Sequence, residues 1–197
     1  MFKQRKLRRS VGALVEGIGH LKSPVPAEVV CRALCDAMGQ RRGRRIEFRT
    51  TAFPPGTASG LVLNLGEQDL VVVEQKTAAE HQIIITGHEL RHLELGHCHG
   101  HVAEGSAAAR LLRHDADLQE VVESALAVAG RHSPAFLKQD GPAARKHRGE
   151  EQAAERYGLE LAHAVKHLLA APLAPALDRD TTSGRIAAAL RQHGIRG

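Results

Sequence analysis

The sequence predicts an α+β fold, because the pattern of apolar residues changes twice along the 197 residues. Two amphipathic helical segments come first, three short strand-like runs follow, and a long helical segment comes next. Helices and strands grouped in this way are typical of α+β domains rather than of alternating α/β ones. A chain of this length forms one domain with a sizeable core. We assign this domain to residues 1–170, and residues 171–197 to a linker with a short helix or tail.

The first two helices are expected at about residues 5–21 and 27–39. In the first, apolar residues recur at the three- and four-residue spacing of an amphipathic helix. Prolines within residues 23–26 separate it from the second, and Gly39 is expected to end the second. The basic run at residues 41–45 is expected to be a solvated turn, and a nucleic-acid-binding patch is the less favoured alternative.

Three short strands are expected at residues 46–50, 60–64 and 69–74. Apolar and polar residues alternate in the first, which indicates a half-buried strand. The third contains a run of consecutive valines, which is typical of a strand. Helices are then expected at residues 78–96, 103–112, 118–129, 150–170 and 186–190, with a loop or lid at residues 133–147.

The composition limits the class of protein. With no Trp and one Tyr, the chain has few aromatic rings to stack on single-stranded nucleic acid. The net charge of +5 suits docking on an acidic partner. Three cysteines without framework spacing indicate a reducing cytoplasm, and Cys31 and Cys35 are expected in the core. No segment reaches the roughly 18 apolar residues that a membrane span needs. We therefore expect a cytoplasmic protein without a membrane segment.

The most informative motif is His-Glu-x-x-His, at His88, Glu89 and His92. Residues four apart on a helix share a face, so the two imidazoles can bind one Zn²⁺ and leave room for a third ligand and a water. Glu89 would then lie beside the metal, where it can accept a proton from that water as general base.

The third ligand does not follow on the same helix. One class of zinc enzymes continues the motif as His-Glu-x-x-His-x-x-Gly-x-x-His, with the third ligand six residues after the second histidine. This chain does not match that pattern, because Gly96 and His97 fall four and five residues past His92 and position 98 is Cys98. Cys98 is a disfavoured ligand. His97, His99 and His101 are expected to contact the last carbonyls of the helix rather than to form a second metal site.

A downstream helix offers a glutamate instead. Glu150, Glu151 and Glu155 lie in its first turns, where the helix dipole favours acidic residues whatever their function. Glu151 and Glu155 are one turn apart, so one can bind zinc while the other accepts a hydrogen bond from the outer nitrogen of a histidine ligand. Spacing by itself does not decide which of the three glutamates would bind the metal.

The chain resembles the ImmA/IrrE family of metallopeptidases, in its compact actinobacterial form, over about residues 5–170. That family has His-Glu-Leu-Gly-His followed by leucines, and then a helix with Glu-x-x-Ala-(Asn/Glu)-x-aromatic. Here these patterns correspond to residues 88–92 and to Glu151, Ala154, Glu155 and Tyr157. The turn at residues 43–46 and the strand start at residues 59–61 are also similar to those members.

The resemblance implies a zincin-like fold with N-terminal helices, a small sheet and a downstream glutamate-bearing helix. It implies that His88, His92 and Glu151 bind Zn²⁺, with Glu155 supporting a histidine. It also implies a regulatory hydrolase that cleaves one protein partner, such as a helix-turn-helix repressor in transcription regulation or an antitoxin of a toxin–antitoxin pair.

Two residues depart from the family pattern. Arg91 replaces the usual glycine of the motif, and it either points away from zinc or folds over the site, where it would clamp a substrate carboxylate or block the water. Gly158 replaces an alanine and is expected to weaken its helix slightly.

Two functions follow as hypotheses. The favoured one is a zinc-dependent endopeptidase, with oxyanion stabilisation from His147, Tyr157 or His163, although each of these has a simpler structural explanation. The alternative is a non-catalytic, metal-stabilised module that binds a protein or nucleic acid, suggested by the basic run at residues 41–45 and a pI of about 9.4.

Overall fold

The computed structural model describes residues 2–55, 57–96, 118–130 and 142–169, and these form an α+β fold, as predicted. The expected helices at 103–112 and 186–190, the tail 171–197 and most of the expected lid lie outside the described residues. The elements are helices α1 (Phe2–Gly17) and α2 (Ala27–Arg42), strands β1 (Arg45–Thr51), β2 (Gly60–Asn64) and β3 (Gln68–Glu74), helices α3 (Ala79–Leu95), α5 (Leu118–Gly130) and α7 (Pro142–Val165), and a 3-10 turn at Lys166–Leu168.

β3 is the middle strand of a three-stranded mixed sheet with the order β1-β3-β2. β1 pairs with it in parallel, with Phe48 opposite Val71, and β2 pairs antiparallel, with Val62 opposite the same valine. The valines of β3 are buried on both faces of the sheet, which explains why they are consecutive instead of alternating with polar residues.

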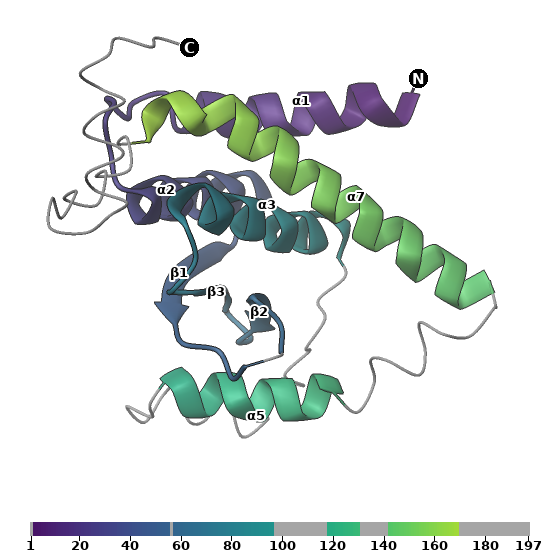
Figure 1. Cartoon of the computed structure of the whole chain (residues 1–197). Helices are drawn as coiled ribbons and strands as arrows, with labels where there is room; N and C mark the ends of the chain where they lie inside the picture. Colours follow the sequence, from purple (N-terminus) through teal and green to yellow (C-terminus); the bar gives the residue numbers. More distant parts are fainter. Residues whose placement is uncertain (1, 56, 97–117, 131–141, 170–197) are drawn as a thin grey trace, which may run out of the picture.

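Helices cover both faces of the sheet (Figure 1). On one face, Phe48 and Val71 pack with α2 and α3, and α1 and α7 stack behind these helices. On the other face, Leu63 and Val72 pack against Val122 of α5. The sheet is thus the middle layer, and α3 lies between it and α7.

The end of α2 differs from the prediction. The helix continues to Arg42 and ends at Gly43, whose φ of 64° is in the left-handed region that glycine adopts without strain. Gly39 lies inside the helix, where a Cβ atom would come within 2.8 Å of the Arg44 carbonyl oxygen. This glycine therefore allows close packing and does not end the helix.

The basic run at residues 41–45 is mostly exposed, as predicted, but its first two residues end α2 and three of its arginines also contact neighbouring elements. Arg41 donates to a backbone carbonyl of α1, and Arg42 donates to the carbonyl of Leu93 in α3. Arg44 forms an ion pair of 3.0 Å with Asp69, whose side chain is buried. These arginines therefore stabilise the packing of neighbouring elements of the same chain.

α7 begins at Pro142, so residues 142–147 are helical and not part of a loop or lid as predicted. Proline is well tolerated in the first turn of a helix, and the alanines, Arg145 and Lys146 that follow are good helix formers. The helix ends at Val165, before the predicted end at residue 170. Among the described residues, no helix combines the length and the apolar character needed to cross a membrane.

α3 and α7 approach each other through glycine backbones. A Cβ atom on Gly87 would lie 2.8 Å from the Cα of Gly158, and one on Gly158 would lie 2.3 Å from the Ile84 carbonyl oxygen. Gly158 therefore does more than weaken its helix, because a larger residue would force the two helices apart. This close contact sets the position of the α7 side chains over α3.

Candidate metal centre

His88 and His92 lie one turn apart on α3 and face the same point. Their Nε2 atoms are 2.9 Å apart, and the two rings meet edge to face at 63°. His92 is 2% exposed, whereas His88 is partly exposed. The histidine pair predicted from helical spacing is therefore present at the surface of α3 that α7 covers.

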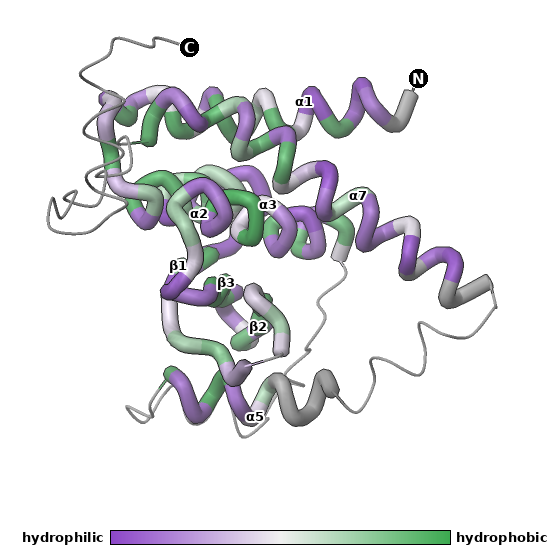
Figure 2. The backbone as a smooth tube through the Cα atoms, viewed as in Figure 1, coloured by the Kyte–Doolittle hydropathy of each residue, from purple (hydrophilic) through white to green (hydrophobic). Residues whose placement is uncertain are grey.

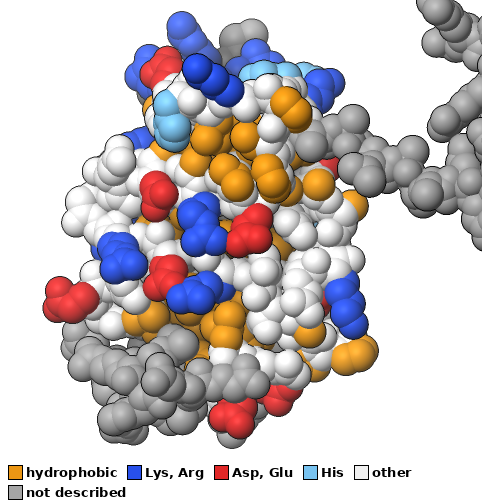
Figure 3. Space-filling model, turned by 90° about the vertical axis from the view of Figure 1, so that its left-hand side faces the viewer, with side chains coloured by type: hydrophobic (Ala, Val, Ile, Leu, Met, Phe, Trp, Pro, Cys, Tyr) orange, Lys and Arg blue, Asp and Glu red, His pale blue; other side chains and the backbone are white. Residues whose placement is uncertain are grey.

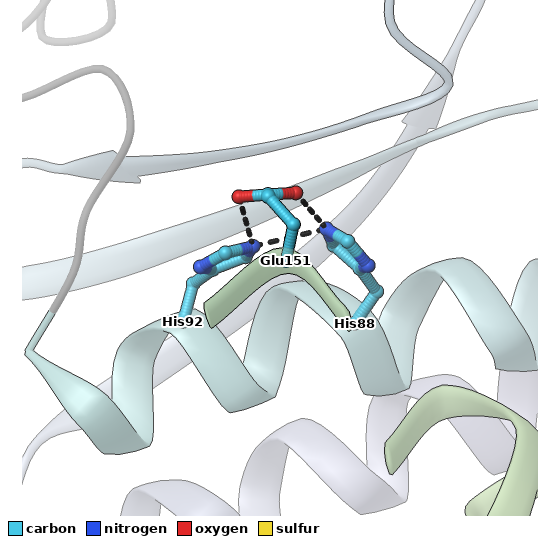
Figure 4. A group of neighbouring side chains, drawn as sticks. All are labelled: His88, His92 and Glu151. Atoms are coloured by element: carbon cyan, nitrogen blue, oxygen red, sulfur yellow. Dashed lines mark hydrogen bonds and ion pairs between the residues drawn. The ribbon is translucent and has the colours of Figure 1, made fainter. Parts of the chain in front are cut away.

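Glu151 of α7 completes the group. Its carboxylate oxygens lie 3.5 Å from Nε2 of His88 and 3.4 Å from Nε2 of His92. Figure 4 shows the carboxylate facing both imidazoles, with each oxygen directed at a different ring. The three donors lie within 4.8 Å of one another and can hold a metal ion.

The donor separations are compatible with a tetrahedral ion. Two ligands that each lie about 2.0–2.2 Å from Zn²⁺ are about 3.3–3.5 Å apart. The two histidine–glutamate distances match this range, and the histidine–histidine distance is a few tenths of an ångström shorter. Two nitrogens and one oxygen also form the donor set of a catalytic zinc site with an open fourth position.

The close contact of α3 and α7 explains why Glu151 is the glutamate in this group. Gly87 is next to His88 in sequence, and Gly158 is two helical turns after Glu151 on α7. Because the helices touch at these glycines, the Glu151 side chain can reach the imidazoles. Glu150 instead lines a cavity on the other side of α7.

The field around the site is negative. Burial disfavours protonation of His88, but its hydrogen bond with Glu151 and the charges of Glu89, Glu151 and Glu155 outweigh burial and raise its pKa. The same charges that attract a proton attract a metal cation. The site therefore favours a positively charged occupant.

Glu89 lies in a cavity of about 480 Å³ beside the donor group, together with His88 and Glu155. The start of β2 forms the opposite wall, where a Cβ atom on Gly60 would lie 2.7 Å from Oε1 of Glu89. Glu89 thus has the placement expected for a group that acts next to a metal and is not a ligand. The hydrogen bond predicted from Glu155 to a histidine stays a prediction.

His81 also lines this cavity and was not predicted from the sequence. It lies seven residues before His88, which is two helical turns and therefore the same side of α3. This spacing was the signal that could have identified it.

Arg91 does not line the cavity of the metal site. Its guanidinium group pairs with Glu94 and lies over the ring of Tyr157, with 5.5 Å between the guanidinium carbon and the ring centroid. Of the two orientations that the sequence left open, the structure has the one that points away from the donor group.

Two of the three candidates for oxyanion stabilisation, Tyr157 and His163, do not line the cavity beside the donor group. Tyr157 is buried and its hydroxyl lies 3.2 Å from the Ser10 hydroxyl, and His163 lines a separate depression along α7. The side chain of His147 lies outside the described part of the chain, as do Cys98 and the histidines at 97, 99 and 101.

Comparison of the chain with protein-family models, with curated proteins and with solved structures finds no match. The case for a metal centre therefore depends on the convergence of the three donors and on the cavity beside them.

Proposed function

We propose that the protein is a zinc-dependent endopeptidase of the ImmA/IrrE type. The observation that carries the proposal is the meeting of His88, His92 and Glu151 at one point, with Glu89 beside them in an open cavity. The nitrogen and oxygen donors favour zinc, since Mg²⁺ and Ca²⁺ prefer sites made of oxygen alone.

Each residue has a distinct role in this proposal. The two histidines and Glu151 hold the ion, which when bound would polarise a scissile carbonyl and lower the pKa of a water. Glu89 accepts the proton of the attacking water and then donates it to the leaving amine. Arg91 leaves the cavity open, so it does not prevent this reaction.

The cavity suits a peptide segment of a folded partner. It is bounded by the start of β2 and by apolar side chains, among them Leu159, which is 57% exposed. Together with the family resemblance, these features support a regulatory peptidase in the cytoplasm that cleaves one partner, such as a helix-turn-helix repressor or antitoxin.

Replacement of Glu89 tests the mechanism. We expect Glu89→Gln to retain one zinc per chain by elemental analysis and to lose cleavage by at least about 100-fold, because it removes only the general base. Cleavage is measured as new N-termini in a proteome-derived peptide library, identified by mass spectrometry. Glu80→Gln is the matched control, since Glu80 lies on α3 and is exposed outside the cavity.

Unchanged cleavage by Glu89→Gln would contradict the proposal. If zinc binds but neither the unmodified protein nor Glu89→Gln cleaves any peptide, the non-catalytic metal-stabilised module is supported instead. The nucleic-acid form of that module has less support, because Arg41, Arg42 and Arg44 are engaged in contacts within the fold.

A further inference from the structure

A second cavity, of about 640 Å³, lies on the other side of α7 from the metal site. The N-terminal turns of α1, the end of α3 and the first half of α7 form its walls. These segments are at the right of Figure 1. It shares no lining residue with the cavity of the metal site. Figure 2 shows that the parts of α1 and α7 that form it are mainly hydrophilic.

The charge of this cavity is strongly positive. One acidic residue, Glu150, lines it. The basic residues that line it are Lys6, Arg91, Arg145, Lys146 and Arg156. In the middle of the face at the left of Figure 1, by contrast, acidic and basic side chains are interspersed (Figure 3). The lining of the cavity is thus more uniformly cationic than that part of the surface.

Most of this charge is not neutralised within the described residues. Glu150 lies 3.7 Å from Lys146. Glu94, which pairs with Arg91, is shared with Arg41. In the part of the chain that the structure describes, Lys6, Arg145 and Arg156 form no ion pair with any carboxylate. Three cations that line one hollow, without a carboxylate partner among the residues that the structure describes, favour an anion there.

The walls also carry apolar surface from Leu7, Leu95 and Ala153. Arginine is well suited to phosphate, since its planar guanidinium donates two parallel hydrogen bonds to phosphate oxygens. A cavity of this size matches the sites of small organic ligands. We propose that it binds a small ligand of nucleotide size with two or more phosphate groups, with the phosphates on the basic side chains of the lining and the organic part on the apolar walls.

This site does not depend on the proposed peptidase activity, because the two cavities share no lining residue. The probes are ATP and inorganic triphosphate, titrated into the metal-free full chain by calorimetry, because both probes chelate Zn²⁺ and would otherwise react at the metal centre. We expect saturable binding of one ligand per chain, and tighter binding of ATP than of triphosphate because of the apolar walls.

Removal of the cations is the first variant test. Arg145→Ala/Arg156→Ala is expected to raise the dissociation constant for ATP at least tenfold. The matched control is Arg8→Ala/Arg9→Ala, which removes the same charge from exposed positions of α1 that do not line the cavity. It is expected to change the constant less than twofold. Equal losses in both variants would overturn the site, since binding would then follow net charge.

Filling the cavity without changing charge is the second test. Gly149 lines the cavity, and a Cβ atom there meets no atom within 4 Å. Gly149→Leu is expected to weaken ATP binding at least fivefold without lowering the melting temperature, because leucine favours the helix more than glycine does. Unchanged affinity in this variant would overturn the proposal. Tighter binding of a 20-nucleotide DNA than of ATP, at equal phosphate concentration, would also overturn the proposal, because it would indicate a nucleic-acid-binding surface.

Discussion

At the scale of single residues, the candidate metal centre depends on which of several neighbouring acidic side chains faces the two histidines. Glu150, Glu151 and Glu155 are all compatible with the charge preference of an early helical turn. Only Glu151 places both carboxylate oxygens within 3.5 Å of the two histidine nitrogens. Glu155, one turn further along α7, faces the cavity beside the site.

This difference predicts that zinc binding is lost when Glu151 is removed. Glu151→Ala should weaken zinc affinity by about 100-fold or more, because even the loss of a residue that only supports a ligand costs 10–100-fold. Zinc per chain after dialysis, measured by elemental analysis, is the readout. Glu150→Ala is the matched control and should keep its zinc. Equal retention by both variants would show that Glu151 is not a ligand.

At the scale of elements, the site is produced by the packing of α3 on α7. The two histidines come from one helix and the carboxylate from the other, and the glycine contact brings the helix axes close enough for them to meet. A change in this distance would therefore affect stability and metal affinity together.

Gly158→Ala is the variant that tests this packing. Its Cβ would lie 2.3 Å from the Ile84 carbonyl oxygen, and backbone cannot rotate away as a side chain can. We expect the free energy of unfolding in denaturant, without metal, to fall by about 1–3 kcal/mol, as for other overpacked sites. Zinc affinity should fall as well, because Glu151 moves away from α3.

The control on the same helix is Gly149→Ala, where the added methyl meets open space. It should raise the free energy of unfolding by about 0.5–1 kcal/mol through helix propensity. A destabilisation as large as that of Gly158→Ala would mean that α7 tolerates no side chain at either glycine, and would contradict the packing explanation.

At the scale of the whole molecule, the sheet divides the apolar interior into two clusters. The larger joins four helices to one face of the sheet, and the smaller joins α5 to the other. The candidate metal ligands belong to the helices of the larger cluster. A bound ion would therefore connect α3 to α7 and stabilise the fold through the difference in zinc affinity between the folded and unfolded chain.

Zinc should consequently raise the stability of the protein by mass action. At a free zinc concentration of 100 times the dissociation constant, the free energy of unfolding should rise by about 2.7 kcal/mol. The measurement compares denaturant unfolding in buffered zinc with unfolding in chelator. Glu151→Ala should show little of this increase, and an increase as large as that of the unmodified protein would argue that zinc acts elsewhere.

The features that could be predicted from the sequence are mostly those set by residues close together in the chain. The helical spacing of His88 and His92, and the alternation in β1, are set by neighbours in the chain, and both predictions are confirmed. The cysteines of α2 were expected in the core, and burial indeed raises the pKa of the Cys31 thiol to about 12. The predicted end of α2 at Gly39 was wrong, because this glycine allows the helix to pack closely against Arg44, which lies outside the helix.

By itself, the sequence determined the pair of histidines, the adjacent Glu89 and the order of helices and strands, since each depends on the regular geometry of a single element. Only the tertiary structure decided that Glu151 joins the pair, that Arg91 turns toward Glu94 and Tyr157, and that β3 lies in the middle of the sheet. These features depend on contacts between distant segments, whose distance is set by packing, here by two glycines that let α3 and α7 touch.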